Sequence, residues 1–261
     1  MMRLRRPLTG LCAALALAWS AAPAAAVPIA WASVDYGGFT NTLHTAVLTS
    51  GASWTVPATW QATTHGSLGW ANKIECLGAG QDGSTSAAPA PGGYGGSYAA
   101  STNIALTPNS SVTIAIGANG SVGGDTWFNG ASCSGASVCA PGGESSTAAI
   151  GATVYAGGQV TCTSGYCAGG GAAGPNGAGG NVSNSTTGGT ADNGTGGAGG
   201  APSNPGGDGT EWGLGSGGGG GAGINLNYGG GGGYYGGGGG AAAAGLERGG
   251  FQGGCLVRWY S

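Results

Sequence analysis

Glycine content is the feature that most limits what this chain can fold into. The sequence holds 65 glycines in 261 residues, and five-residue glycine tracts occupy 217–221, 229–233 and 236–240. Average proteins contain about 7% glycine. Glycine has no side chain to bury and loses more backbone entropy on ordering than any other residue. The chain therefore either orders this stretch through dense backbone hydrogen bonding or leaves it disordered.

The first 26 residues have the layout of a secretory signal peptide. Three arginines precede an apolar run at 8–19, and the small-residue segment AAPAAA at 21–26 ends before Val27. The apolar run is shorter than the roughly 20 residues of a membrane-spanning helix. We therefore expect cleavage and export, with an uncleaved anchor as the alternative. The mature protein would be secreted, periplasmic or held at the cell surface.

The charge of the mature chain excludes some classes of partner. Without the first 26 residues, three basic residues face nine acidic ones, which gives a net charge of −6. No basic patch remains to neutralise phosphate groups, so we expect no nucleic-acid partner. No second apolar run is long enough to span a membrane after signal cleavage.

The number and spacing of the cysteines favour disulfides. Seven cysteines become six once Cys12 leaves with the signal segment, an even number in an exported chain. Four of them form two pairs that are close in sequence and flank Gly/Ser-rich turns, which leaves the remaining two together. Zinc sites need CxxC or Cys/His spacing, which is absent here. Among several possible connectivities, the preferred pairs are Cys76–Cys255, Cys133–Cys139 and Cys162–Cys167.

Alternating apolar residues predict β-strands, and no helical periodicity follows the signal segment. The strongest patterns lie at 72–78, 111–117 and 255–260. Each pattern has an apolar face, formed by Ile74 and Cys76, by Val112, Ile114 and Ile116, and by Cys255, Val257 and Trp259. Lys73, Glu75 and Leu77 lie on the opposite face of the first pattern. Weaker strand patterns occur at 53–56, 98–106, 126–128, 147–155 and 224–228.

These patterns predict an all-β fold, a jelly-roll-like β-sandwich whose last strand returns to pair with an early one. We expect an N-terminal segment at 27–47 and the domain at 48–261, with a glycine-rich excursion at about 169–254. A Cys76–Cys255 bridge would close a long loop and stabilise the domain by about 4–5 kcal/mol. The excursion would form polyglycine II-like helices, which are threefold and rise about 3.1 Å per residue, or remain partly disordered.

Five stretches of the sequence are similar to one known family. They are LTSGASWTVPATW at 48–60, NKIECLGAG at 72–80, GGDTWFNG at 123–130, GGGAAGPNGAGG at 169–180 and the terminal GGCLVRWY. They resemble the glycine-rich domain proteins of bacteriophage tail-associated and prophage genes. The resemblance implies a β-sandwich that carries a lattice of polyglycine helices. The chain differs from that family in its signal segment, its cysteines and QDGSTSAAPAPGG at 81–93, where the family has polyglycine.

No catalytic constellation stands out in the sequence. His44 and His65 are its only histidines, and the carboxylates are scattered singly. GGDGTEWGL at 206–214 is a single imperfect copy of a calcium-binding repeat, an architecture that needs several stacked copies. We therefore predict a non-enzymatic protein with no cofactor and no metal.

Aromatic residues within the glycine-rich stretch are the best candidates for ligand contact. Trp212, Tyr228, Tyr234 and Tyr235 lie among small residues that offer little local core. Exposed rings on a rigid scaffold are common on recognition surfaces. We expect these rings to contact a cell-surface glycan or protein; the alternative is that they anchor the glycine stretch to the β core. The predicted role is adhesive or structural at a surface, with a phage or prophage tail component as the alternative and a secreted enzyme as the third hypothesis.

Overall fold

The computed structural model describes residues 27–28, 32–36, 39–61, 71–223, 228–242 and 249–261. These residues form strands, turns, extended segments and the short 3-10 helices η2 (Cys133–Gly135) and η3 (Asp192–Gly194), with no α-helix among them. The all-β class is therefore confirmed. The predicted signal segment at 1–26 and most of the predicted strand at 224–228 lie outside the described residues.

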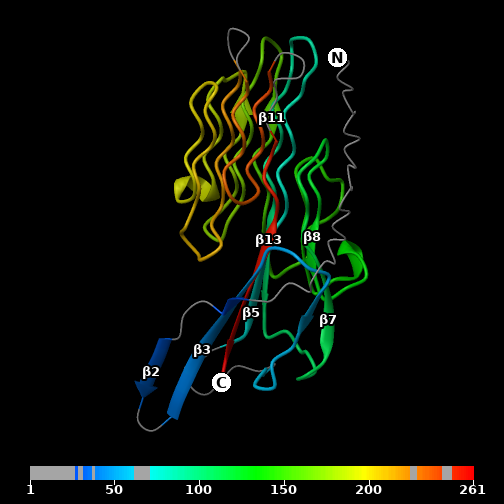
Figure 1. The fold of residues 1–261 in the computed structure, drawn as a ribbon, viewed down its shortest axis with the longest axis vertical. Helices are drawn as coiled ribbons and strands as arrows, with labels where there is room; N and C mark the ends of the chain where they lie inside the picture. The colour runs from blue at the N-terminus through cyan, green and yellow to red at the C-terminus, as the bar shows by residue number, and fades with distance from the viewer. Residues whose placement is uncertain (1–26, 29–31, 37–38, 62–70, 224–227, 243–248) are drawn as a thin grey trace, which may run out of the picture.

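Most strands belong to two antiparallel sheets in the lower half of Figure 1. Within the described part of the chain, one sheet has the order β1-β3-β13-β5-β6-β10, with β2 also paired to β3, and the other has the order β4-β7-β8-β9. β11 and β12 form a short parallel pair. The strands are β1 (Val27–Pro28), β2 (Ala32–Tyr36), β3 (Phe39–Leu48), β4 (Ser53–Thr55), β5 (Lys73–Leu77), β6 (Tyr98–Thr102), β7 (Ser111–Ala115), β8 (Thr126–Phe128), β9 (Val138–Ala140), β10 (Thr153–Tyr155), β11 (Val160–Thr161), β12 (Val182–Ser183) and β13 (Gly254–Tyr260).

The two sheets share one apolar core, and the predicted apolar faces supply much of it. Ile74 and Cys76 of β5 pack in the same cluster as Val112 and Ile114 of β7 and Phe128 of β8. The other residues of the predicted apolar faces also contribute. Cys255 and Val257 belong to the cluster, and Ile116 and Trp259 pack against it. The alternation of side chains along a strand explains why the period-two pattern located this core correctly.

The last strand returns to the middle of the first sheet, as predicted. β13 lies between β3 and β5 and is antiparallel to both. Its register places Cys255 opposite Cys76, and a disulfide joins them across 179 residues of sequence. The other two bridges are Cys133–Cys139 and Cys162–Cys167, so the structure contains the three preferred pairs.

Strand β3 extends the domain further toward the N-terminus than the predicted boundary at residue 48. Residues 43–48 of β3 pair with β13, so much of the predicted N-terminal segment belongs to the central sheet. The sequence FTNTLHTAVL shows no clear period-two pattern, because polar residues interrupt its N-terminal part and residues 46–48 are consecutively apolar. The sequence patterns also did not predict β1, β2, β9, β11 and β12, four of which have only two or three residues.

Above the sheets, extended glycine-rich segments run side by side (Figure 1). We name them the glycine bundle, and it comprises 167–173, 178–181, 188–191, 197–201, 205–210, 215–223, 228–233 and 237–242. Tight turns connect several of these segments, for example at 174–177, 202–204 and 211–214. Each segment therefore lies beside others that are distant in sequence.

Hydrogen bonds in the glycine bundle follow a period of three. In the central segment, Gly217, Gly218 and Gly219 donate to three different neighbouring segments, and the next three residues donate to the same three segments in the same order. The acceptors in sequence are the carbonyls of Tyr235, Gly207, Gly189, Gly238, Asn204 and Thr186, at distances of 2.7–3.0 Å. A threefold extended helix presents its amide groups in this way.

Segments of the first half of the chain also join these hydrogen bonds. Gly93 donates to the carbonyl of Gly239 and Gly96 to that of Gly236, each at 2.7 Å, while Gly239 donates to the carbonyl of Gln81 at 2.9 Å. The bundle contacts therefore extend beyond the predicted excursion at 169–254. The stretch at 81–93, which lacks polyglycine, takes part through its backbone.

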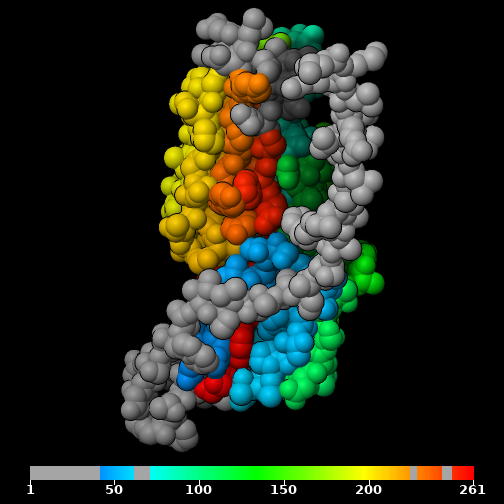
Figure 2. All heavy atoms as spheres, viewed as in Figure 1, coloured from blue at the N-terminus to red at the C-terminus, as the bar shows by residue number. Residues whose placement is uncertain are grey.

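A second apolar cluster connects the bundle to the outer face of the seven-stranded sheet. Leu77, Tyr98 and Leu256 of the sheet pack with Ala172, Ala173, Ala191, Trp212 and Leu214 of the glycine-rich stretch. Figure 2 shows the bundle as a closely packed block directly above the strands. The sheet is thus covered on both faces at this end.

Two further observations bear on the compartment. Three disulfides are typical of an oxidising, extracellular environment. Over the residues that the structure describes, no helix is long and apolar enough to cross a membrane.

Candidate binding surface

Trp212 is buried where the glycine bundle meets the seven-stranded sheet. Its ring is 6% exposed and lies edge-on to Tyr98, with the ring centroids 5.4 Å apart. Its indole N–H donates to the Ser216 hydroxyl at 3.1 Å. This position agrees with the anchoring alternative, because the ring is enclosed rather than presented on the surface.

Tyr234 and Tyr235 occupy a turn of the bundle, and they differ in exposure. Tyr234 is 49% exposed, whereas Tyr235 is half-buried and packs against the cluster that contains Trp212. Burial raises the pKa of the Tyr235 hydroxyl, with a smaller contribution from Tyr234 and Asp208 nearby. Of this adjacent pair, Tyr235 anchors the turn and Tyr234 is available for contact.

Phe251 completes an aromatic group that the sequence reasoning missed. The centroid of its ring lies 3.7 Å from that of Tyr234 and 6.1 Å from that of Tyr235. Asp208 accepts a hydrogen bond from the Tyr234 backbone N–H at 2.8 Å, so a carboxylate lies beside the exposed ring. We name Tyr234, Tyr235, Phe251 and Asp208 the aromatic patch. The sequence signal for Phe251 was an aromatic residue between two glycine pairs, the same signal that pointed to the tyrosines.

The backbone under the aromatic patch is fixed on several sides. Phe251 donates to the carbonyl of Gly237 at 2.9 Å and accepts from the N–H of Gly80 at 2.7 Å. The carbonyl of Tyr235 accepts from the N–H of Gly217 at 2.7 Å. Because the rings are attached to hydrogen-bonded backbone, little backbone entropy remains to be lost when a ligand binds.

Tyr228 lies apart from the aromatic patch. It is 53% exposed and is separated from Tyr234 by the extended tract at 229–233. Trp212, in turn, is enclosed where the bundle meets the sheet. The four rings predicted as contact residues therefore do not form one surface.

Neither of the two histidines of the sequence belongs to the aromatic patch. His44 stacks on Trp259 with ring centroids 5.0 Å apart, and its Nε2 lies 2.7 Å from the hydroxyl of Ser261. His65 lies outside the described residues. A search of the described chain finds no group of three or more His, Cys, Asp or Glu residues that could hold a metal ion.

Comparison with known proteins adds no assignment of family. The chain matches no protein-family model, and no curated protein matches it significantly. Its function must therefore be argued from the geometry of its surface.

Proposed function

We propose that the protein is exported and serves as a non-enzymatic recognition or adhesive protein at a cell surface. Its architecture would be a jelly-roll-like β-sandwich that carries a lattice of polyglycine II-like helices. The shared core of the two sheets and the period-three hydrogen bonds of the glycine bundle support this architecture. The signal-like segment and the three disulfides support export.

The observation that carries the recognition role is the exposed ring of Tyr234 on a rigid support. Half of its surface is accessible, although Phe251 packs against it and Asp208 holds its backbone. Aromatic residues that combine large contact area with low entropy cost are common contact residues in binding proteins. A partner that is itself a glycan or protein at a cell surface fits this patch.

Attachment of the purified mature chain to cells tests the proposal. Tyr234→Ala is expected to reduce attachment at least about tenfold, as for a central aromatic contact. Val122→Ala is the matched control, because Val122 is 54% exposed and lies outside the patch. Both variants must keep the wild-type melting temperature. Equal attachment by the two variants would refute a contact role for Tyr234.

A phage or prophage tail component is the second candidate, and the five similar stretches across 48–261 favour it. The two roles differ in where the mature chain is found. Recovery of the protein in purified virions would favour the tail component, and recovery in the culture medium or envelope of cells without phage would favour the exported protein.

A further inference from the structure

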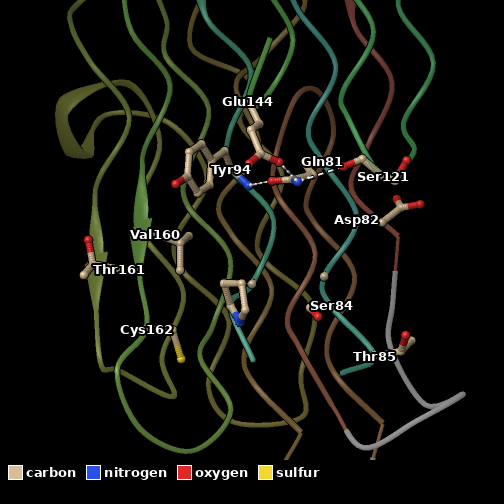
Figure 3. Close-up of a pocket in the computed structure, with 13 residues that line it drawn as sticks. Gln81, Asp82, Ser84, Thr85, Tyr94, Ser121, Glu144, Val160, Thr161 and Cys162 are labelled. Carbon is tan, nitrogen blue, oxygen red and sulfur yellow. Dashed lines mark hydrogen bonds between the residues drawn. The ribbon is translucent and has the colours of Figure 1, made fainter. Parts of the chain in front are cut away.

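A polar cleft lies beside the glycine bundle, and its lining includes no residue of the aromatic patch. Its volume is about 770 Å³, within the range of about 300–1,000 Å³ that small-molecule sites occupy. Figure 3 shows Val160, Thr161 and Cys162 on one side, Asp82, Ser84 and Thr85 on the other, and Tyr94, Gln81 and Glu144 at one end. A second hollow of about 470 Å³ shares Tyr94 and Glu144 with the first. Tyr94 and Glu144 thus lie where the two hollows adjoin.

The walls of this cleft are preformed by backbone hydrogen bonds. Gln81 donates to the carbonyl of Tyr94 at 2.9 Å, and Ser84 donates to that of Pro91 at 3.0 Å. The Cys162–Cys167 disulfide holds the opposite wall. A ligand would thus enter a cleft that needs little ordering, which lowers the free-energy cost of binding.

Hydrogen bonds also fix the two carboxylates of the cleft. Gln81 Nε2 donates to Glu144 and, at 2.8 Å, to the carbonyl of Ser121, while its Oε1 accepts from the Tyr94 N–H at 3.0 Å. Asp82 Oδ1 accepts from the Gly250 N–H at 2.8 Å. Across the described residues, both ion pairs are formed by Glu75 and neither of these carboxylates takes part in one. Asp82 and Glu144 thus keep acceptor capacity for a ligand.

Glu144 also has an unfavourable backbone conformation. Its φ is 61°, in the left-handed region that costs free energy for a residue other than glycine. Gly143, which has no Cβ, directly precedes it in the turn. Glu144 is thus a strained, non-glycine residue whose side chain lines the cleft. Strained residues are common at ligand-binding sites, which favours a binding role for this carboxylate.

The chemistry of the lining selects the class of ligand. The cleft presents carboxylates, an amide, the hydroxyls of Ser84, Thr85 and Thr161, and one side of the half-buried Tyr94, with no lysine or arginine among the lining residues that the structure describes. Phosphate, sulfate or sialic acid would meet two carboxylates with no compensating cation from these described residues, which is unfavourable. Sugar hydroxyls would donate charge-assisted hydrogen bonds to the carboxylates, and a sugar ring would pack on the tyrosine.

We propose that this cleft is a binding site for a neutral oligosaccharide, with Glu144 as hydroxyl acceptor and Tyr94 as the stacking ring. The inference rests on the proposed recognition role. Its site shares no residue with the aromatic patch, so either can fail without the other. The volume of about 770 Å³ is large enough for a short oligosaccharide.

The test is a glycan array that carries neutral, sialylated and sulfated oligosaccharides, probed with the disulfide-bonded mature chain. Calorimetric titration of the strongest neutral binder follows. The neutral glycan is expected to bind, to shift the NMR signals of the Tyr94 ring, and to bind Glu144→Gln at least about tenfold more weakly, the loss expected for a hydrogen bond to a charged group. Glu144→Gly serves as a second variant, because glycine adopts a φ of 61° without strain and folding should be preserved.

Gly135→Ala is the control and is expected to bind the neutral glycan within twofold of wild type, because no atom lies within 4 Å of a Cβ added there and Gly135 belongs to neither site. The inference would be overturned by an array with no neutral binder or with only anionic binders. It would also be overturned by equal affinity of Glu144→Gln and the wild-type protein. If Tyr234→Ala loses cell attachment but still binds the neutral glycan, the result supports a contact role for the aromatic patch and a separate glycan site in the cleft.

Discussion

Replacing one central glycine by alanine tests whether the glycine bundle is packed as densely as its hydrogen bonds indicate. At Gly219, an added Cβ would lie 2.9 Å from the carbonyl carbon of Gly170 and closer still to the carbonyl of Gly169. Carbon atoms in contact are about 3.5–4.0 Å apart. The neighbouring segment would therefore have to move by roughly 1 Å.

Such a movement would break hydrogen bonds that have no substitute. Gly169 donates to the carbonyl of Gly220 at 2.8 Å and accepts from the N–H of Gly189 at 2.9 Å. A displacement of roughly 1 Å takes both beyond hydrogen-bonding distance. If each of the two broken bonds costs about 1–3 kcal/mol, Gly219→Ala should lower the free energy of unfolding by about 2–6 kcal/mol. The melting temperature should fall by roughly 10 °C.

Gly135→Ala is the matched control. No atom lies within 4 Å of a Cβ added at Gly135, and its φ is not positive. Alanine there should be neutral or stabilising by about 0.4–1 kcal/mol, through lower entropy of the unfolded chain. Urea unfolding followed by tryptophan fluorescence compares the two variants, since Trp212 is buried beside the bundle. Ordinary surface substitutions change the free energy of unfolding by about 0.5 kcal/mol or less. If the free energies of unfolding of the two variants differ by no more than this, the close packing of segment 215–223 is refuted.

Three further predictions follow from the covalent and ionisable groups. Replacing Cys76 and Cys255 together by alanine should destabilise the chain by about 5 kcal/mol, against about 2 kcal/mol for the pair Cys162 and Cys167, because their loops span 179 and 5 residues; urea unfolding measures both. Burial raises the pKa of Glu211, whose carboxylate oxygens are enclosed, so protonation favours the folded state. Stability should therefore decline as pH rises from 4.5 through that raised pKa, and Glu211→Gln should flatten the dependence of melting temperature on pH. Burial, followed by the nearby Glu75 carboxylate, raises the pKa of Tyr98, so ultraviolet titration should show this hydroxyl still protonated at pH 11 in the folded protein.

The β core was predictable because its signals are local. Alternation in β5, β7 and β13 identified the faces that meet in the core, and the spacing of the cysteines indicated the three disulfides. The pairing of β13 with β5 followed from the two cysteines on apolar faces. These features depend on which residue types occur at fixed spacings along the chain, and this information is present in a single sequence.

The binding surfaces were less predictable because they depend on which segments become neighbours. Trp212, Tyr228, Tyr234 and Tyr235 have the same sequence context, yet only the packing of the bundle decides that Trp212 is enclosed. Glycine tracts carry no periodic pattern that would specify their partners. The cleft around Glu144 draws on segments as distant as β11 and residues 81–85, which no local pattern connects.

Glu75 lies in a charge network that connects the glycine bundle to the seven-stranded sheet. The sequence placed this carboxylate on the outer face of β5, where water would ordinarily solvate it, but it is only 1% exposed because the bundle covers that face. A buried carboxylate is tolerated only with several partners. Glu75 accepts from the Tyr98 hydroxyl at 2.6 Å, from Lys73 Nζ at 2.8 Å and from Arg258. Arg258 also donates to the carbonyl of Trp212 at 2.6 Å, which connects the charge network to the bundle. Removing the bundle would expose the apolar outer face of the sheet and leave Arg258 without this acceptor, so the glycine-rich segments are required for the sheet that they cover.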